Sequence, residues 1–406
     1  MNGRAARVMD QCRQIAQMSE EPGRITRRFL TPPMRDVHAL LRTRMEALDM
    51  SVHIDAAGNL HGLWSPTNAP RLILGSHIDT VPDAGAFDGV LGVLMAMEWV
   101  QIAQELNLPL PMEVIAFSEE EGVRFGVPFI GSRAVAGRFD PALLALKDAQ
   151  GLTMEQVIRD FGLDPGKVAD AAISAAIRGF VEIHIEQGPV LESQNLSLAA
   201  VTAISGQTRM TLEFRGQANH AGTTPMTLRR DALATAAEWI ATVETLARQT
   251  QDLVATVGKM EVEPNAGNVV PGMARVSLDV RHVHDSTRVG AATSLLESAE
   301  AIANRRGLQL EVKHQLDQPA VPMDERLTAF LAEAMEAAGL PPKRMPSGAG
   351  HDAMVMAAKM PATMLFLRSP GGISHHPAEA VREQELVAAL EIAGSFLRRI
   401  ASEHNF

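Results

Sequence analysis

The residues with the clearest chemical potential lie in the run GSHIDTVPDAGAFDGVLG, residues 75–92. The run follows the apolar residues 72–74, which have the composition of a buried strand. His77 and Asp79 are two residues apart, so on a strand their side chains point to the same face. Asp88 adds a second carboxylate in a loop bounded by glycines. Open α/β sheets bind ligands at the carboxyl ends of their strands, so we interpret this run as half of a metal site.

Further candidate ligands follow predicted strands or lie in loops elsewhere in the chain. The complete set is His77, Asp88, Glu121, His184 and His375. Imidazoles and carboxylates without a thiolate suit zinc, manganese, cobalt or nickel rather than an iron–sulfur cluster or a structural zinc ion. An Asp in a Gly-flanked turn can bridge two cations through its two oxygens. Asp79 is predicted to accept the second N–H of the His77 imidazole and so fix its tautomer.

An acidic triplet, Glu119-Glu120-Glu121, follows the predicted strand at residues 112–117. Adjacent side chains diverge at the end of a strand, so neighbouring carboxylates can play different roles. One can bind a metal ion while the other accepts a proton from water. The alternative is a solvated acidic loop without catalytic function.

Each of the other motifs also has a purely structural alternative. His184 in VEIHIEQG could be a core histidine on a strand, and the pair His375-His376 in GGISHHPAE could belong to a surface turn. The pair Asn219-His220 in NHAGTTP could belong to a helix cap, with Thr223 or Thr224 as the capping residue and Pro225 at the first helical position. The order and spacing of all the motifs together favour the functional reading.

Composition and charge narrow the class of protein. At 406 residues, two domains are expected. Hydrophobic residues make up 46% and charged residues 21%, the balance of a soluble globular enzyme. The net charge of −11 argues against nucleic-acid and anionic-membrane partners, which both favour a basic face.

The single cysteine, Cys12, excludes an intrachain disulfide and a thiolate metal cage. Residues 1–30 are rich in arginine and lack a sustained apolar core, so we expect no signal peptide. No apolar run approaches the ~20 residues that span a bilayer. These features predict a cytoplasmic protein.

The chain outside the motifs predicts an α/β fold with two domains. Helices and a hairpin are expected over residues 1–66, followed by strands at 72–74, 112–117 and 180–185 with a helix from 90 to 106 between the first two. Strands alternating with helices are typical of a large doubly wound α/β domain. We assign residues 1–208 and 321–406 to this domain.

Residues 209–320 are predicted to form a smaller α+β domain that interrupts the larger one. Their expected order is a strand at 209–215, a helix at 229–250, strands at 253–262 and 274–280, a helix to 306 and a strand at 309–314. This β-α-β-β-α-β order is that of a ferredoxin-like sandwich.

Motifs along nearly the whole chain resemble those of one enzyme family. They are GSHIDT, GAFDG, EEEGVRF, GSRAVAG, HIEQGPVLE, NHAGTTPM, NVVPG, DVRH, SGAGHDA and GGISHHPAE, in that order. The chain thereby resembles the hydantoinase/carbamoylase-type amidohydrolases of the metal-dependent aminoacylase and carboxypeptidase superfamily.

The resemblance implies specific roles for the metal ligands. Two divalent ions are expected, zinc or manganese, with cobalt or nickel as further options. His77 and His184 would hold one ion and Glu121 and His375 the other, with Asp88 as the bridge. A cis peptide would follow Asp88.

The resemblance also implies roles for residues that bind metal or substrate. His376 is the fallback ligand for His375. Glu120 would be the general base, and Gln207, Asn268, Arg281 and Gly350 would bind the substrate.

The family resemblance further implies a homodimer in which the smaller domain serves as lid and dimer interface. His220 would reach the partner's active site, and Arg281 would pair with a substrate carboxylate through its planar fork. The expected reaction is hydrolysis of a small-molecule ureido carboxylate to ammonia and carbon dioxide. Allantoate is slightly favoured over an N-carbamoyl-L-amino acid, because of the SGAGHDAM and FGVPFIGSRAVAG blocks.

Two other functions remain open on the sequence. A metallo-aminopeptidase or dipeptidase of the same superfamily would more often carry a carboxylate where His184 stands. A non-catalytic metal-binding relative would not need every catalytic position filled. In this sequence every expected catalytic position is filled, which argues against that alternative.

Overall fold

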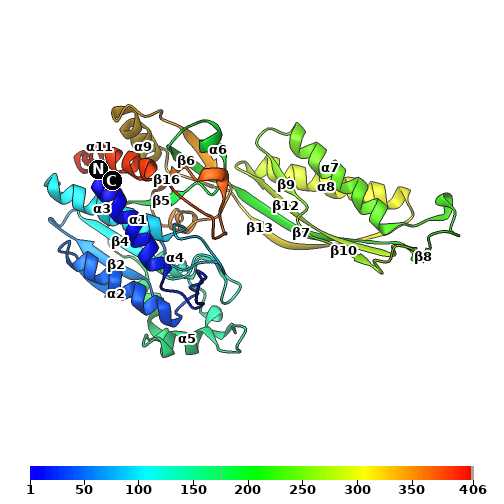
Figure 1. The fold of residues 1–406 in the computed structure, drawn as a ribbon, viewed down its shortest axis with the longest axis horizontal. Coiled ribbons are helices and arrows are strands. Elements are labelled where there is room, and N and C mark those ends of the chain that lie inside the picture. The colour runs from blue at the N-terminus through cyan, green and yellow to red at the C-terminus, as the bar shows by residue number, and fades with distance from the viewer. Residues whose placement is uncertain (175, 404–406) are drawn as a thin grey trace. The chain divides into compact units, whose positions relative to one another are not determined.

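The computed structural model describes residues 1–174 and 176–403, and the chain divides into two compact units. The larger unit combines Met1–Thr202 with the chain from Met323 onward, and the smaller unit is Ala203–Pro322 (Figure 1). The sequence placed the smaller domain at residues 209–320. The observed unit begins six residues earlier and ends two residues later.

The larger unit is a mixed sheet with helices packed against it. Its helices are α1 (Asn2–Ala16), α2 (Pro32–Glu46), α3 (Val90–Glu105), α4 (Ile130–Val135), α5 (Met154–Asp160), α6 (Val190–Ser193), α9 (Glu325–Ala337), α10 (Asp352–Met356) and α11 (Glu383–Ser402). Its strands are β1 (Ser51–Ile54), β2 (Leu60–Trp64), β3 (Arg71–His77), β4 (Met112–Phe117), β5 (Ile177–Ile185), β6 (Leu198–Ile204), β15 (Arg344–Ser347) and β16 (Ala362–Leu367).

The sheet order is β1-β2-β4-β3-β5-β16-β6, and its centre is parallel. The pairs β3–β4, β3–β5 and β5–β16 are parallel, whereas β2–β4 and β16–β6 are antiparallel. The carboxyl ends of β4, β3, β5 and β16 therefore lie at one edge of the sheet. The α/β fold class predicted from the sequence is confirmed, as are the strands predicted at 72–74, 112–117 and 180–185, although β3 extends to His77.

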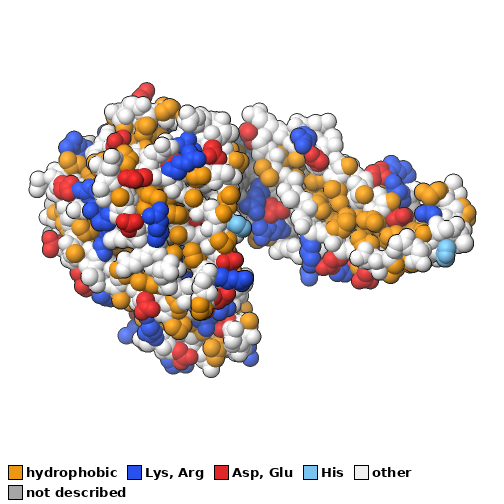
Figure 2. Space-filling model, viewed as in Figure 1, with side chains coloured by type: hydrophobic (Ala, Val, Ile, Leu, Met, Phe, Trp, Pro, Cys, Tyr) orange, Lys and Arg blue, Asp and Glu red, His pale blue; other side chains and the backbone are white. Residues whose placement is uncertain are grey.

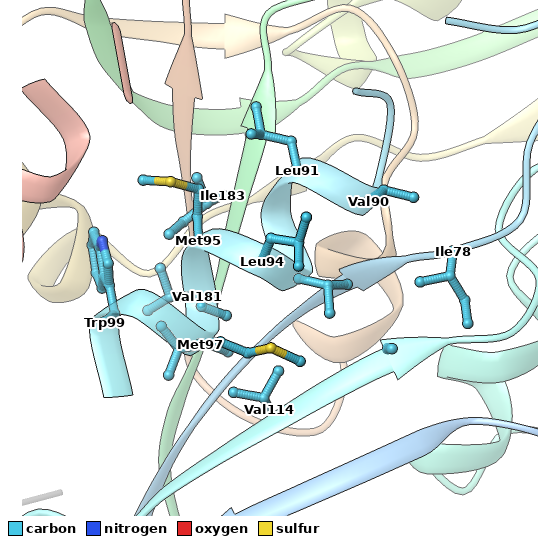
Figure 3. Packing of buried hydrophobic residues seen from close by; sticks show 14 of the residues in the cluster. Ile78, Val90, Leu91, Leu94, Met95, Met97, Trp99, Val114, Val181 and Ile183 are labelled. Carbon is cyan, nitrogen blue, oxygen red and sulfur yellow. The ribbon is translucent and has the colours of Figure 1, made fainter. Parts of the chain in front are cut away.

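Helix α3 is buried on nearly every side and anchors this central sheet (Figure 3). Trp99, Met95 and Met97 are fully buried, and Figure 3 shows them among Val114, Val181 and Ile183 of the strands. Gly92 permits the close approach, because a Cβ there would lie 2.1 Å from the carbonyl oxygen of Ile183. A helix that is apolar all round belongs in the interior, and this one fixes the loop that precedes it.

The smaller unit has the predicted ferredoxin-like order. It contains β7 (Gly206–Arg215), β8 (Asn219–His220), α7 (Ala232–Gln249), β9 (Val254–Thr256), β10 (Met260–Glu263), β11 (Val269–Val270), β12 (Met273–His282), α8 (Asp285–Arg305), β13 (Gln309–Gln318) and β14 (Val321–Pro322), with a short turn of helix, η3 (Met226–Leu228). Its antiparallel sheet has the order β10-β12-β7-β13, with β9 also paired to β12. Burial alternates strictly along β12, so one face of the sheet packs under α7 and α8 and the other is left more exposed.

Two predicted boundaries in the smaller unit differ from the observed ones for local reasons. Helix α7 begins at Ala232 rather than 229, because the Asp231 side chain accepts the N–H of Ala234 as an N-cap. The single strand predicted at 253–262 is split into β9 and β10. Between them the main-chain N–H of Lys259 donates to the Ser277 hydroxyl at 3.0 Å instead of to a strand carbonyl.

Candidate metal centre

The predicted metal ligands of the larger unit converge at the carboxyl edge of its sheet. His77 ends β3, His184 lies near the end of β5, and Asp88 precedes α3. Glu121 follows β4, and His375 lies in the loop after β16. The order of the strands in the sheet thus explains why ligands far apart in sequence meet.

Asp88 lies at the middle of this group. Its Oδ1 is 3.2 Å from Nε2 of His184 and 3.7 Å from Nε2 of His77. Its Oδ2 is 3.4 Å from Nε2 of His375, which is in turn 3.6 Å from Oε1 of Glu121. The ligand atoms fall into overlapping groups, His77–Asp88–His184 and Asp88–Glu121–His375, and Asp88 belongs to both.

Two of the imidazoles are held so that Nε2 faces Asp88. Nδ1 of His77 lies 3.0 Å from the main-chain oxygen of Asp79, and Nδ1 of His184 lies 2.9 Å from that of Ile185. A carbonyl oxygen accepts a hydrogen bond from a protonated Nδ1, and this tautomer leaves the lone pair on Nε2 for a metal ion. This is the tautomer that a metal ligand requires.

The prediction for the Asp79 carboxylate needs correction. The main-chain carbonyl of Asp79 is closer to the His77 Nδ1 than its carboxylate oxygen, which is 3.4 Å away. The carboxylate instead accepts the N–H groups of Glu120 at 2.9 Å and Glu121 at 3.1 Å. Asp79 therefore orients His77 through its backbone and the acidic triplet through its side chain.

The acidic triplet is not a solvated loop. Glu119 is fully buried and accepts the N–H of Phe29 at 3.0 Å. Glu120 is 8% exposed, and its carboxylate lies with His77 and Glu121 in one group of ligand atoms. Burial raises the pKa of Glu120 well above its usual range, and the nearby carboxylates of Glu121 and Asp352 act in the same direction.

The residues present fit a bound cation. Oε1 of Glu121 and Nε2 of His184 are buried without a hydrogen-bond partner, which is costly unless a ligand satisfies them. Burial alone would raise the pKa of Asp88, but the imidazoles of His184, His375 and His77 outweigh it and hold that pKa well below its usual range. The centre therefore favours positive charge beside Asp88.

The expected cis peptide after Asp88 is wrong. Among the described residues the cis bond is Glu263–Pro264, so Asp88–Gly89 is trans. The chain reverses instead through a γ-turn, with Gly89 at φ 66 and ψ −57 and the N–H of Val90 donating to the Asp88 carbonyl at 2.7 Å. No side chain fits at Gly89, because a Cβ would lie 2.5 Å from Nδ1 of His77.

His376 and Gly350 are placed differently from the ligands. Nδ1 of His376 accepts the N–H of Ala378 at 3.1 Å, and His376 belongs to none of the ligand groups among the described residues. Gly350 is exposed in the loop before α10, where a Cβ would lie 3.0 Å from the Phe129 ring.

Sequence reasoning missed Gln187, which lies two residues after β5. Its amide nitrogen donates to both carboxylate oxygens of Asp88 at 3.2 Å and to the Ser374 hydroxyl at 2.9 Å. Its φ of 57 is unusual for a residue other than glycine. The signal that could have identified Gln187 is its position directly before a glycine in HIEQG, at the end of a strand that carries a candidate ligand.

In the smaller unit, Gln207 and Arg281 are cross-strand partners on β7 and β12. Both contact Asp279, a residue that sequence reasoning also missed. Nε2 of Gln207 donates to it at 2.6 Å, and Arg281 donates from Nε at 2.9 Å and from Nη2 at 3.0 Å. The alternation of β12 places Asp279 and Arg281 on the same face, which is the signal that could have linked them.

His220 and Asn268 lie close together at the two-stranded sheet formed by β8 and β11. His220 lies on β8 opposite Val269 of β11, and the N–H of Ala221 donates to the Asn268 carbonyl at 2.9 Å. Nδ1 of His220 accepts the N–H groups of Gly222 and Thr223 at 3.0 and 3.2 Å. A neutral His220 therefore carries its proton on Nε2. His220 is exposed on strand β8 and is not part of a helix cap.

Residues 73–399 match the family model described as peptidase family M20/M25/M40. The chain belongs to this family. Members of the family are metal-dependent, and the described residues provide the groups of ligand atoms that a metal requires. The recognition made from the sequence motifs is confirmed.

Curated relatives in this family are amidohydrolases. The chain is 37% identical to the N-carbamoyl-L-amino acid amidohydrolase of Geobacillus stearothermophilus, over 95% of this chain and 96% of that protein. It is 35% identical to the allantoate amidohydrolase of Escherichia coli, over 94% of each chain. These relatives make the chain a hydrolase of C–N bonds in compounds other than peptides.

Solved structures agree with this placement. A hydantoinase/carbamoylase family amidase from Burkholderia multivorans has a TM-score of 0.92, with 30% identity and 98% of each chain covered. AtUAH in complex with glyoxylate has a TM-score of 0.78, again with 30% identity over 98% of each chain. Among the described residues of the present chain, no helix is long and apolar enough to cross a membrane.

Proposed function

We propose that this protein is a two-metal amidohydrolase that cleaves a terminal ureido group. The overall reaction converts R–NH–CO–NH2 and water to R–NH2, ammonia and carbon dioxide. The observation that carries the proposal is the position of Asp88, whose two oxygens face imidazoles from different parts of the sheet edge. A carboxylate shared by two ligand groups is typical of hydrolytic centres with two ions.

The ligand groups support one assignment of residues to ions. His77 and His184 would hold the first ion and Glu121 and His375 the second, with Asp88 between them. Zinc and manganese suit this ligand set, and cobalt or nickel are compatible with it. Bound there, the ions would supply Lewis-acid polarisation of the carbonyl and make an attacking water more acidic.

Glu120 is the proposed general base. Its carboxylate is buried beside His77, where it can take the proton of the water that attacks the carbamoyl carbon. It then returns this proton to the leaving nitrogen. Its backbone N–H is fixed by Asp79, so the side chain begins from a defined position.

The smaller unit would recognise the substrate and form the dimer. Arg281 is proposed to pair with the substrate carboxylate. Asp279 accepts two hydrogen bonds from the Arg281 guanidinium and so orients it. Gln207 and Asn268 are proposed as further substrate contacts in this unit, and Gly350 in the larger one. We propose that the unit also acts as a lid.

The distance between Arg281 and His220 along the smaller unit supports the proposal that His220 acts at the active site of a partner subunit. Gln207 lies at the start of β7 and His220 beyond its end at Arg215. The strand alone spans about 26 Å at ~3.3 Å per residue, so one small substrate cannot touch Arg281 and His220 of the same chain. His220 is therefore proposed to polarise the carbonyl at the partner's site through its Nε2–H.

Exposed apolar side chains of the smaller unit also fit a dimer interface. Met226 is 76% exposed and Leu228 72% exposed, both close in sequence to His220. Figure 2 shows hydrophobic side chains at the surface of this unit, beside charged side chains of both signs. Large exposed apolar side chains often mark a protein interface.

Allantoate is the favoured substrate, and an N-carbamoyl-L-amino acid is the second candidate. Both carry a carboxylate and a ureido group, and curated relatives of both kinds are 35–37% identical to this chain. The solved complexes of AtUAH with glyoxylate and with (S)-hydroxyglycine also concern small carboxylate-bearing molecules. These ligands are compatible with either candidate, and the preference for allantoate rests on the SGAGHDAM and FGVPFIGSRAVAG blocks.

Ammonia release decides between these substrates. Protein reconstituted with manganese, zinc, cobalt or nickel is assayed with allantoate and with a panel of N-carbamoyl-L-amino acids. A 100-fold higher kcat/KM for allantoate, about 2.7 kcal/mol of transition-state discrimination, supports the favoured assignment. The reverse preference supports the second candidate, and release from neither contradicts the proposal.

A further inference from the structure

Glu379 is a buried carboxylate at the end of an exposed loop, residues 371–379, that also carries His375. Its side chain is 4% exposed, although Pro377 and Ala378 directly before it are exposed. Burying a carboxylate costs free energy unless hydrogen bonds compensate. The partners of Glu379 therefore indicate what it does.

The two oxygens of Glu379 contact two different loops. Oε1 accepts the main-chain N–H of Asp88 at 3.0 Å and that of Phe87 at 3.4 Å. Oε2 accepts the hydroxyl of Ser374, the neighbour of His375, at 3.1 Å. One side chain thus links the loop that carries Asp88 to the loop that carries His375.

Gly85 is shaped to receive this carboxylate. A Cβ at Gly85 would lie 2.4 Å from Cβ of Glu379 and 2.5 Å from its Oε1. Gly85 has no left-handed φ, so close approach rather than backbone conformation explains the glycine. The loop before α3 is therefore built around the Glu379 side chain.

We propose that Glu379 is a positioning residue that holds Asp88 and His375 in the arrangement that binds the second metal ion. The inference rests on the proposed two-metal function. Glu379 does not itself belong to a ligand group among the described residues. It acts through the backbone of Asp88 and through Ser374.

The ions differ in how much they depend on Glu379. His77 and His184 lie on core strands β3 and β5, which keep their positions without it. His375 lies on an exposed loop and its Cα has a left-handed φ of 53. Asp88 is shared by both ions, whereas His375 serves only the second. Loss of Glu379 therefore weakens the ion between Glu121 and His375 more than the ion between His77 and His184.

The test is a metal titration of the metal-free protein against a competing chelator, with manganese and with zinc. In Glu379→Ala we expect the second ion to bind 10–100-fold more weakly, the usual effect of losing a group that orients ligands. In Glu379→Gln we expect recovery, because the amide oxygen can still accept the N–H of Asp88. The exposed Glu383→Gln serves as the matched control.

Gly85→Ala provides a second route that leaves Glu379 in the chain. The new methyl group displaces the carboxylate, so this variant should also lose affinity for the second ion. Gly290→Ala, where a Cβ meets nothing within 4 Å, is its control. The double variant Gly85→Ala/Glu379→Ala should be no worse than Glu379→Ala alone, since both changes remove one interaction.

Two results overturn the inference. The first is wild-type affinity for both ions in Glu379→Ala and Gly85→Ala. The second is an equal loss of both ions that Glu379→Gln does not recover, because that pattern indicates a general loss of structure. A wild-type protein that binds two ions but releases no ammonia contradicts the proposed reaction and leaves this inference standing.

Discussion

Oδ1 of Asp88 lies 3.2 Å from Nε2 of His184, although the two residues are 96 positions apart and come from a loop and a strand. The Nδ1 atom of His184 is held by a main-chain carbonyl, so its Nε2 is turned toward Asp88. Asp88 thereby belongs to two of the groups of candidate ligand atoms at this edge of the sheet.

Glu120→Gln tests proton transfer. The amide cannot accept the proton of water, so we expect kcat to fall by about 10²–10⁴-fold, the usual contribution of a general base. Metal content should be unchanged, because Glu120 is not one of the proposed ligands and its backbone N–H still donates to Asp79. Steady-state kinetics and elemental analysis measure both quantities, and turnover like that of wild type would remove Glu120 from this role.

Hybrid dimers test whether His220 acts on the partner. Glu120→Gln and His220→Ala chains are each expected to be nearly inactive alone, but a hybrid dimer would have one site with both groups intact. Random exchange of subunits makes half of the dimers hybrid, so about a quarter of wild-type activity should return. Activity that stays at the level of the separate variants would show that His220 does not act across the dimer.

Gly89→Ala tests the turn that follows Asp88. Its Cβ would meet His77 Nδ1 at 2.5 Å, so we expect loss of metal binding as well as stability. Gly126→Ala has a similar φ of 71 but meets nothing within 4 Å. Both variants should lose about 1–2 kcal/mol from the left-handed backbone, while only Gly89→Ala should lose metal. Equal metal binding in the two variants contradicts the prediction.

Arg281→Lys tests recognition of the substrate carboxylate. A lysine cannot reproduce the planar fork, so we expect KM to rise by about 10–100-fold, as for loss of a hydrogen bond to a charged group. Arg275→Lys is the control, because Arg275 lies on the same strand and pairs with Glu213 and Glu261. An unchanged KM for Arg281→Lys would exclude Arg281 as the carboxylate partner.

His61 gives the stability of the protein a pH dependence away from the metal centre. Burial alone would lower the pKa of His61, but hydrogen bonds to Asp55 and Glu113 outweigh it and raise it to about 9. A histidine in the unfolded chain has a pKa of about 6.5. The stabilisation is therefore complete below pH ~6.5 and is lost as the pH rises through about 9.

Urea unfolding of His61→Gln at several pH values measures this effect. Wild type should have a higher free energy of unfolding than the variant at pH ~6. This advantage should shrink by up to about 3 kcal/mol above pH ~9. The exposed His314→Gln should show no such difference. A gap between wild type and His61→Gln that is independent of pH would contradict the raised pKa.

The strands and the convergence of the candidate ligands could be predicted from the sequence because their signals are local. The apolar runs before His77 and the acidic triplet mark buried strands, and parallel strands bring their carboxyl ends together. Family motifs then named the ligands in order. The ferredoxin-like order of the smaller unit was equally readable from strand and helix periodicity.

The contacts that hold the ligands could not be predicted in the same way. Glu379 and Asp88 are 291 positions apart, and no local pattern links a buried carboxylate to a distant backbone N–H. The Asp79 carboxylate prefers two backbone N–H groups over an imidazole, a competition that only the folded geometry decides. The trans bond at Asp88 depends on the γ-turn of Gly89, which allows the reversal without a cis peptide.

Ureido hydrolysis is proposed to take place at a centre of two metal ions. It is tested by the rate of ammonia release from allantoate, measured as metal-free protein receives increasing equivalents of manganese or zinc. We expect no activity without metal and a rise that ends at two ions per chain. Full activity without added metal, or no ammonia from allantoate or any N-carbamoyl-L-amino acid at full loading, would contradict it.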